Sequence, residues 1–178
     1  SSNEHEERAV QLENTIEEIK NSTDYNSYIE IQSRLSDCES EEKQIRHDIN
    51  DEFTKISRPL GKFVHISAHD KELKDLTAKL ANSPFDVLNT ENIPGIKSVL
   101  DSIIIGINTG SVSVKDVSKS KQSVEEIKDS LQSLINTKET FESKKYELTQ
   151  KLENINLQLL QNAENDLKNE ERNLSDVS

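Results

Sequence analysis

Two histidines four residues apart, His65 and His69, are the first residues whose spacing could support chemistry. On a helix this spacing places both imidazoles on one face, as in many zinc sites. A zinc site needs at least one further ligand, and only Asp70 lies close by in the sequence. We therefore interpret the two histidines as polar residues near a helix start, and we predict neither a metal ion nor a cofactor.

The segment Pro59-Leu60-Gly61-Lys62 contains the Gly-Lys pair of a phosphate-binding loop. The upstream glycine of that motif is missing, and Phe63 stands where a serine or threonine is required. Adjacent acidic pairs such as Glu17-Glu18 and Glu41-Glu42 recur along the chain. Catalytic carboxylates need a shielded cleft that separates their pKa values, whereas repeated acidic pairs are typical of solvated helix faces. The sequence therefore predicts a protein that is not an enzyme and has no catalytic residues.

Composition limits the elements that could position any site. Of the 178 residues, 31% are apolar and 31% are charged, although a compact domain usually has nearer to about half apolar residues. All glycines and prolines lie between Pro59 and Gly110, so the long stretches on either side contain no strong helix breaker. These features predict an all-α fold. The single cysteine, Cys38, excludes an internal disulfide and fits a reducing compartment, so we expect a cytoplasmic protein.

The charge and the apolar runs of the chain restrict its partners. Its net charge of −12 argues against a general nucleic-acid-binding surface, and Lys115, Lys119 and Lys121 form the only visible basic cluster in the second half. The longest apolar stretch, residues 99–107, is too short to span a bilayer, so we predict no membrane insertion. Because the chain begins with Ser1 rather than Met, we expect it to be a segment of a larger protein.

Apolar residues in the two flanking stretches, 1–57 and 113–178, recur in alternating steps of three and four. This heptad spacing is typical of coiled coils and predicts two helical arms. Glu42, Lys138 and Lys145 occupy positions of the same seam. Such residues either fix register and partner choice or extend their charged ends to water. The predicted arm seam comprises Ile31, Leu35, Cys38, Ile45, Ile49, Phe53, Val124, Ile127, Leu131, Leu134, Phe141, Leu148, Leu152, Ile155 and Leu159.

The apolar pattern changes phase once in each arm. In the first arm a stripe around Ile16 lies out of phase with the rest, and residues 21–24 are of types that favour caps over helix interiors. We expect a kink there, with a full break as the alternative. In the second arm the seam shifts after Leu159 to Leu160, which alters supercoiling without ending the helix.

Neither arm is expected to be stable alone, because its narrow apolar stripe would lie in water. The other arm of the same chain is the nearest partner. In an antiparallel pair of such arms, facing residue numbers would sum to about 170. That register places Cys38 near Leu131 and Leu134, and it places Glu42 near Lys128. Pairing between two chains remains an open alternative.

Residues 58–112 form a separate insert that holds all the helix breakers of the chain. We predict helices over 70–81, from Pro84, and from Pro94 to the glycines at 106 and 110, with Ser111 or Ser113 capping the second arm. The last insert helix is apolar nearly all round, and about 55 residues are marginal for an independent core. We therefore expect the insert to complete its core by forming a homodimer. The predicted interface comprises Leu73, Leu76, Leu80, Phe85, Leu88, Ile96, Val99, Leu100, Ile103, Ile104 and Ile107.

This order of arm, insert and returning arm resembles the coiled-coil region of the structural-maintenance-of-chromosomes (SMC) and Rad50/SbcC-like ATPases. The heptad arms carry the resemblance, with an insert from Arg58-Pro59-Leu60-Gly61-Lys62-Phe63 through Ser111-Val112-Ser113-Val114-Lys115-Asp116. The sequence departs from that family because it has no Cys-x-x-Cys zinc hook, no ATPase motif and only a short insert.

The resemblance implies a long antiparallel coiled-coil hairpin with a small helical insert at its tip. In such a family the hairpin would be a structural or dimerisation segment of a DNA-maintenance ATPase. The alternative function is a free-standing scaffold or tether that binds other proteins.

Overall fold

The computed structural model describes residues 1–177, and every element in that range is a helix, which confirms the all-α prediction. The elements in chain order are α1 (Ser2–Lys20), α2 (Thr23–Thr54), α3 (Ser57–Ile66), α4 (Lys71–Asn82), α5 (Pro84–Val87), the 3₁₀ turn η1 (Thr90–Asn92), α6 (Ile93–Thr109), α7 (Val117–Glu153) and α8 (Gln158–Val177).

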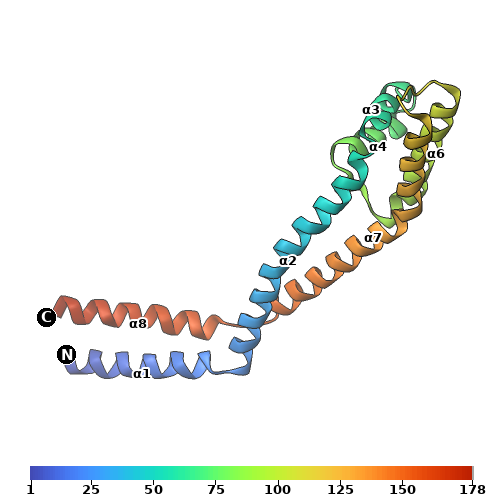
Figure 1. Cartoon of the computed structure of the whole chain (residues 1–178). Helices are drawn as coiled ribbons and strands as arrows, with labels where there is room; N and C mark the ends of the chain where they lie inside the picture. The colour runs from blue at the N-terminus through green and yellow to red at the C-terminus, as the bar shows by residue number, and fades with distance from the viewer. Residues whose placement is uncertain (178) are drawn as a thin grey trace. The chain divides into compact units, whose positions relative to one another are not determined.

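The helices belong to two compact units (Figure 1). Unit 1 comprises Ser1–Cys38 and Lys145–Ser178, and unit 2 comprises Glu39–Lys144. Each of the two longest helices, α2 and α7, contributes residues to both units. The boundaries of the units therefore fall inside the predicted arms rather than at their ends.

Unit 1 is built mainly from α1 and α8, which lie side by side and antiparallel (Figure 1). Ile16 of α1 is buried against Leu160 and Ala163 of α8. Near the chain ends, the buried Glu170 carboxylate accepts a hydrogen bond from the His5 ring and lies 3.3 Å from the Arg8 guanidinium. A narrow apolar stripe therefore holds these two helices together, with an ion pair near one end of the contact.

Both arms are interrupted, and the predicted kink in the first is a full break. Helix α1 ends at Lys20, where the Ser22 hydroxyl donates to the Ile19 carbonyl at 2.6 Å and accepts from the Tyr25 N–H at 3.2 Å. The second break, over residues 154–157, was not predicted, and the expected continuous helix is wrong there. At this break the Asn156 side chain caps α8 by accepting from the Gln158 N–H at 2.9 Å.

The breaks change the register that the sequence predicts. In unit 1, Arg8 and Glu170 have numbers that sum to 178, and in unit 2 the ion pair of Glu41 and Lys144 sums to 185, so the predicted value of about 170 is wrong. Two residues separate α1 from α2, and four residues separate α7 from α8. Because these non-helical residues are unequal in number, a single constant sum cannot describe both arms.

Unit 2 contains the predicted insert helices and one that the sequence did not predict. Helix α4 agrees with the expected span of 70–81 within one residue, and Pro84 occupies the first turn of α5 as expected. Helix α3 was missed because Pro59 and Gly61 were counted among the helix breakers of the insert, yet Pro59 lies in the first helical turn, where proline is tolerated. The prediction that Ser111 or Ser113 caps the second arm is wrong. Asp116 caps α7 instead, since its carboxylate accepts from the Lys119 N–H at 3.0 Å.

Helix α6 lies at the centre of the apolar core of unit 2. Its side chains Ile96, Val99, Leu100 and Ile103 are fully buried, whereas Ile105 is 62% exposed. The helix ends at Gly110, whose φ of +82° is the left-handed conformation that favours glycine after a helix. The chain then turns back, and the Val112 N–H donates to the Gly106 carbonyl at 2.9 Å.

This turn gives a prediction for Gly106. The Gly106→Ala variant is expected to lose about 1–3 kcal/mol of unfolding free energy by overpacking. The reason is that a Cβ atom at this position would lie 2.5 Å from Val112 Cγ2 and 3.3 Å from Val112 Cβ. Urea titration followed by circular dichroism measures the change.

Gly61→Ala is the matched control, because Gly61 lies within α3 and a Cβ atom there would meet nothing within 4 Å. This variant is expected to gain about 0.5–1 kcal/mol from helix propensity. Changes of the same sign in the two variants would contradict the packing of Val112 on Gly106.

Candidate functional site

The predicted seam residues are mostly buried in the structure. Ile31, Leu35, Leu134, Leu152 and Ile155 are half-buried. Leu159 is 73% exposed, because the break before α8 turns Leu160 inward in its place. Ile135, which the heptad pattern left out, is fully buried. The remaining seam residues are buried, namely Cys38, Ile45, Ile49, Phe53, Val124, Ile127, Leu131, Phe141 and Leu148.

The residues predicted to form a dimer interface pack largely inside the chain itself. Three of them, Leu73, Leu76 and Ile104, are half-buried. The others are buried, namely Leu80, Phe85, Leu88, Ile96, Val99, Leu100, Ile103 and Ile107. A single chain therefore completes most of the core that was expected to need a second copy.

The two lysines of the predicted seam lie in opposite environments. Lys138 is 6% exposed, and its ammonium donates a hydrogen bond to the Phe85 carbonyl. Lys145 is exposed to solvent. Lys128 pairs with Asp101 of α6 at 2.6 Å rather than lying near Glu42, and this hydrogen bond raises the pKa of Lys128. Glu41, the neighbour of Glu42, pairs with Lys144, which lies sixteen residues along α7 from Lys128, so the predicted contact of Glu42 with Lys128 is wrong.

Phe85 connects α2 to α7 within unit 2. The Arg46 guanidinium carbon lies 4.1 Å from the centroid of the Phe85 ring, and the Lys138 ammonium lies 4.5 Å from it. Arg46 also lies 3.6 Å from the Asp86 carboxylate, and Lys138 lies 3.6 Å from Glu142. We call these five residues the Phe85 junction. Cation–π contacts from two helices to one ring, together with the Lys138 hydrogen bond, fix the segment after α4 between those helices.

A second connection lies at the residue of α7 that directly follows Lys138. The Glu139 carboxylate accepts hydrogen bonds from the Thr90 hydroxyl at 2.6 Å and from the Thr90 backbone N–H at 2.7 Å. These bonds favour the ionised form and lower the pKa of Glu139, the hydroxyl contributing most. Glu139 thereby attaches η1 to α7.

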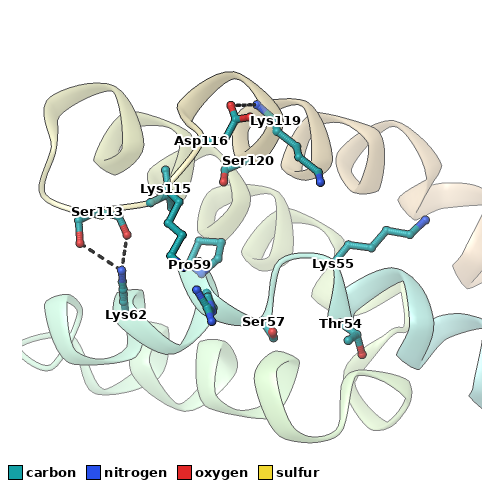
Figure 2. A pocket seen from close by; sticks show the side chains of 12 residues that line it. Thr54, Lys55, Ser57, Pro59, Lys62, Ser113, Lys115, Asp116, Lys119 and Ser120 are labelled. Carbon is teal, nitrogen blue, oxygen red and sulfur yellow. Dashed lines mark hydrogen bonds between the residues drawn. The ribbon is translucent and has the colours of Figure 1, made fainter.

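The candidate binding site is a cleft of about 650 Å³ in unit 2. The end of α2, the start of α3, the loop before α7 and the start of α7 form its walls (Figure 2). We call it the basic cleft, because five of its lining residues are cationic and only Asp116 is acidic. The lining residues are Thr54, Lys55, Ser57, Arg58, Pro59, Lys62, Ser113, Val114, Lys115, Asp116, Lys119 and Ser120.

Two of the five cations have partners within unit 2. Lys62 donates hydrogen bonds from α3 to the Ser113 carbonyl and, at 3.1 Å, to its hydroxyl, which ties α3 to the loop before α7 (Figure 2). Lys55 pairs with Glu52 at 2.9 Å, and this contact raises the pKa of Lys55. Figure 2 shows Lys115 extending from that loop toward Pro59.

The sequence pattern revealed only part of this cleft. It identified the cluster of Lys115, Lys119 and Lys121, but it did not connect that cluster with Arg58 and Lys62. Arg58 and Lys62 are four residues apart, as are Lys115 and Lys119. The signal that could have revealed the cleft was a pair of basic residues four apart at the start of the insert and a second such pair just after its end.

The histidine pair does not form a shared face. His65 lies in the last turn of α3, and His69 lies beyond the end of that helix, both exposed. No group of three or more His, Cys, Asp or Glu side chains within residues 1–177 is arranged to hold a metal ion. Over the same residues, no helix combines the length and apolar character needed to cross a membrane.

Comparison with models of known protein families, with curated proteins and with solved structures finds no match to this chain.

The first prediction for this region concerns the variant Lys138→Met. Methionine keeps the apolar stem of the side chain and removes the ammonium. The Phe85 carbonyl would lose its donor in a buried place, so a loss of about 1–3 kcal/mol of unfolding free energy is expected. Lys151→Met on the same helix is the matched control, and a change within about 0.5 kcal/mol is expected at that exposed position. Equal effects in urea titrations would show that burial of Lys138 contributes nothing.

Glu139 gives a prediction about pH. Because folding lowers its pKa, its contribution to stability is present above the pKa of the unfolded chain and is lost as pH falls through the folded pKa. Wild type is therefore expected to be more stable than Glu139→Gln at pH 7. The difference should close as pH falls below the ordinary pKa of a glutamate, roughly 4.3. Urea titrations at several pH values measure it, and a difference that grows in acid would contradict the assignment.

Proposed function

We propose that this chain is a non-enzymatic structural segment of a larger protein, in which two helical arms pair antiparallel and hold unit 2 as a rigid module. The observation that carries the proposal is the Phe85 junction. Through it, α2 and α7 are fixed to the same short segment of the insert, so a force on either helix reaches the other within unit 2. A segment built in this way can transmit or resist movement along its arms.

The continuity of the long helices supports this role. Helix α2 spans 32 residues and α7 spans 37, which correspond to roughly 48 Å and 55 Å of rise. Each contributes to both units. In unit 1, α1 and α8 pack antiparallel, and in unit 2 an ion pair joins Glu41 of α2 to Lys144 of α7. We extend these contacts to a hairpin in which both arms belong to one molecule. This arrangement would be similar to the coiled-coil region of the SMC and Rad50/SbcC-like ATPases.

A homodimer of this segment would need a different surface from the predicted one. Phe85, Leu88 and most α6 side chains are already buried in the core of unit 2. Ile105 of α6 is the exposed apolar residue nearest to them in sequence. We therefore place any dimer contact of unit 2 on the outer face of α6 rather than on its core face.

Zero-length crosslinking tests whether the arms pair within one chain. The Glu41 carboxylate lies 2.6 Å from the Lys144 ammonium, so a carbodiimide should join them by an amide bond. In a mixture of ¹⁴N-labelled and ¹⁵N-labelled chains, mass spectrometry is expected to find the two crosslinked peptides always with the same label. Peptides of mixed label in about half of the crosslinks would show pairing between chains and overturn the hairpin.

Two controls belong to this experiment. Asp101 and Lys128, 2.6 Å apart in unit 2, should crosslink in the same sample, and Glu41→Gln should abolish only the crosslink between residues 41 and 144.

The parent gene supplies the second test of the proposed role. It is expected to encode nucleotide-binding motifs on both sides of this segment, and their absence would contradict membership of such an ATPase.

A further inference from the structure

We propose that the basic cleft binds a compact anion that carries two or more phosphate groups. Three of its cations, Arg58, Lys115 and Lys119, make no side-chain hydrogen bond or ion pair with any residue in the described range. Like charges gathered around one space repel each other, and a bound anion would relieve that repulsion. This inference does not rest on the structural role proposed above, because it concerns unit 2 alone.

The chemistry of the lining matches phosphate. Arg58 offers a planar guanidinium that can donate two parallel hydrogen bonds to one phosphate, and the lysines offer mobile point charges. The hydroxyls of Ser57 and Ser120 line the same space and can donate to further phosphate oxygens. The one carboxylate of the cleft, that of Asp116, already accepts the Lys119 N–H as the cap of α7.

The distribution of formal charge over unit 2 favours a compact ligand over a polymer. Unit 2 contains 15 Lys and Arg residues against 18 Asp and Glu residues, a formal charge of −3. Five cations and one carboxylate line the cleft, a formal charge of +4, so the rest of unit 2 carries −7. A nucleic-acid strand leaving the cleft would meet that negative surface, whereas a compact anion would not. The volume of about 650 Å³ lies within the range of small-molecule sites, roughly 300–1,000 Å³.

Isothermal titration calorimetry of the full chain with inorganic tripolyphosphate tests the proposal. Wild type is expected to bind one tripolyphosphate, and to bind orthophosphate at least about tenfold more weakly, since a single phosphate reaches fewer cations. The double variant Lys115→Ala/Lys119→Ala is expected to raise Kd for tripolyphosphate by about tenfold or more. Lys115→Arg/Lys119→Arg, which keeps both charges, should retain binding within about threefold.

The matched control removes two lysines of unit 2 outside the cleft. Lys71→Ala/Lys74→Ala on α4 changes the net charge equally and is expected to leave Kd unchanged, because both side chains are exposed away from the lining. If Lys71→Ala/Lys74→Ala weakened binding as much as Lys115→Ala/Lys119→Ala, binding would depend only on net charge, and the proposed site would be overturned. Far-ultraviolet circular dichroism of each variant verifies that the helices are intact.

Two further outcomes would also overturn the proposal. One is the absence of measurable tripolyphosphate binding to wild type at millimolar concentration. The other is tighter binding of a single-stranded oligonucleotide than of tripolyphosphate, with the same loss in Lys115→Ala/Lys119→Ala, which would make the cleft a nucleic-acid site. A failed crosslink between Glu41 and Lys144 leaves this result untouched, so the two proposals can fail separately.

Discussion

Burial of the Lys138 ammonium against Phe85 is the interaction on which the rest of unit 2 depends. A lysine at an apolar position costs free energy unless its charge finds partners, because water no longer solvates it. Here the Phe85 carbonyl accepts from the ammonium, the Phe85 ring faces it, and Glu142 lies 3.6 Å away. All of these partners are correctly placed only when the segment after α4 lies against α7. Burial of Lys138 is therefore compensated only when this segment of the insert is in the position that the structure shows.

Arg46 connects the same segment of the insert to α2. It lies over the Phe85 ring and near Asp86, so the insert segment contacts both long helices through two adjacent residues. A polar residue at one position of an apolar seam can fix the register of two helices, at a cost in stability. Directional contacts to one ring and one carbonyl do not tolerate slips of that register.

Local signals in the sequence were sufficient for α4, for the start of α5 and for the end of α6, but not for α3. Pro84 and Gly110 occupy the helix start and end that their backbone preferences dictate. The failures have a different origin. Ser22 and Asn156 interrupt the arms by capping hydrogen bonds, which compete with a helix only when tertiary packing also favours the break. A heptad pattern contains no information on that competition.

The basic cleft could not be predicted from the sequence, for a related reason. Its cations come from segments more than 50 residues apart, with Arg58 at the start of α3 and Lys115 in the loop before α7. Only the return of the chain after α6, fixed by Gly110 and by the hydrogen bonds from Lys62 to Ser113, brings them to one place. An anion held by Arg58 and Lys115 together would join the start of α3 to the loop before α7, adding to the hydrogen bonds from Lys62 to Ser113. Occupancy of the cleft would then stabilise the junction between the insert and the long helices, so the ligand and the mechanical integrity of unit 2 would be linked by mass action.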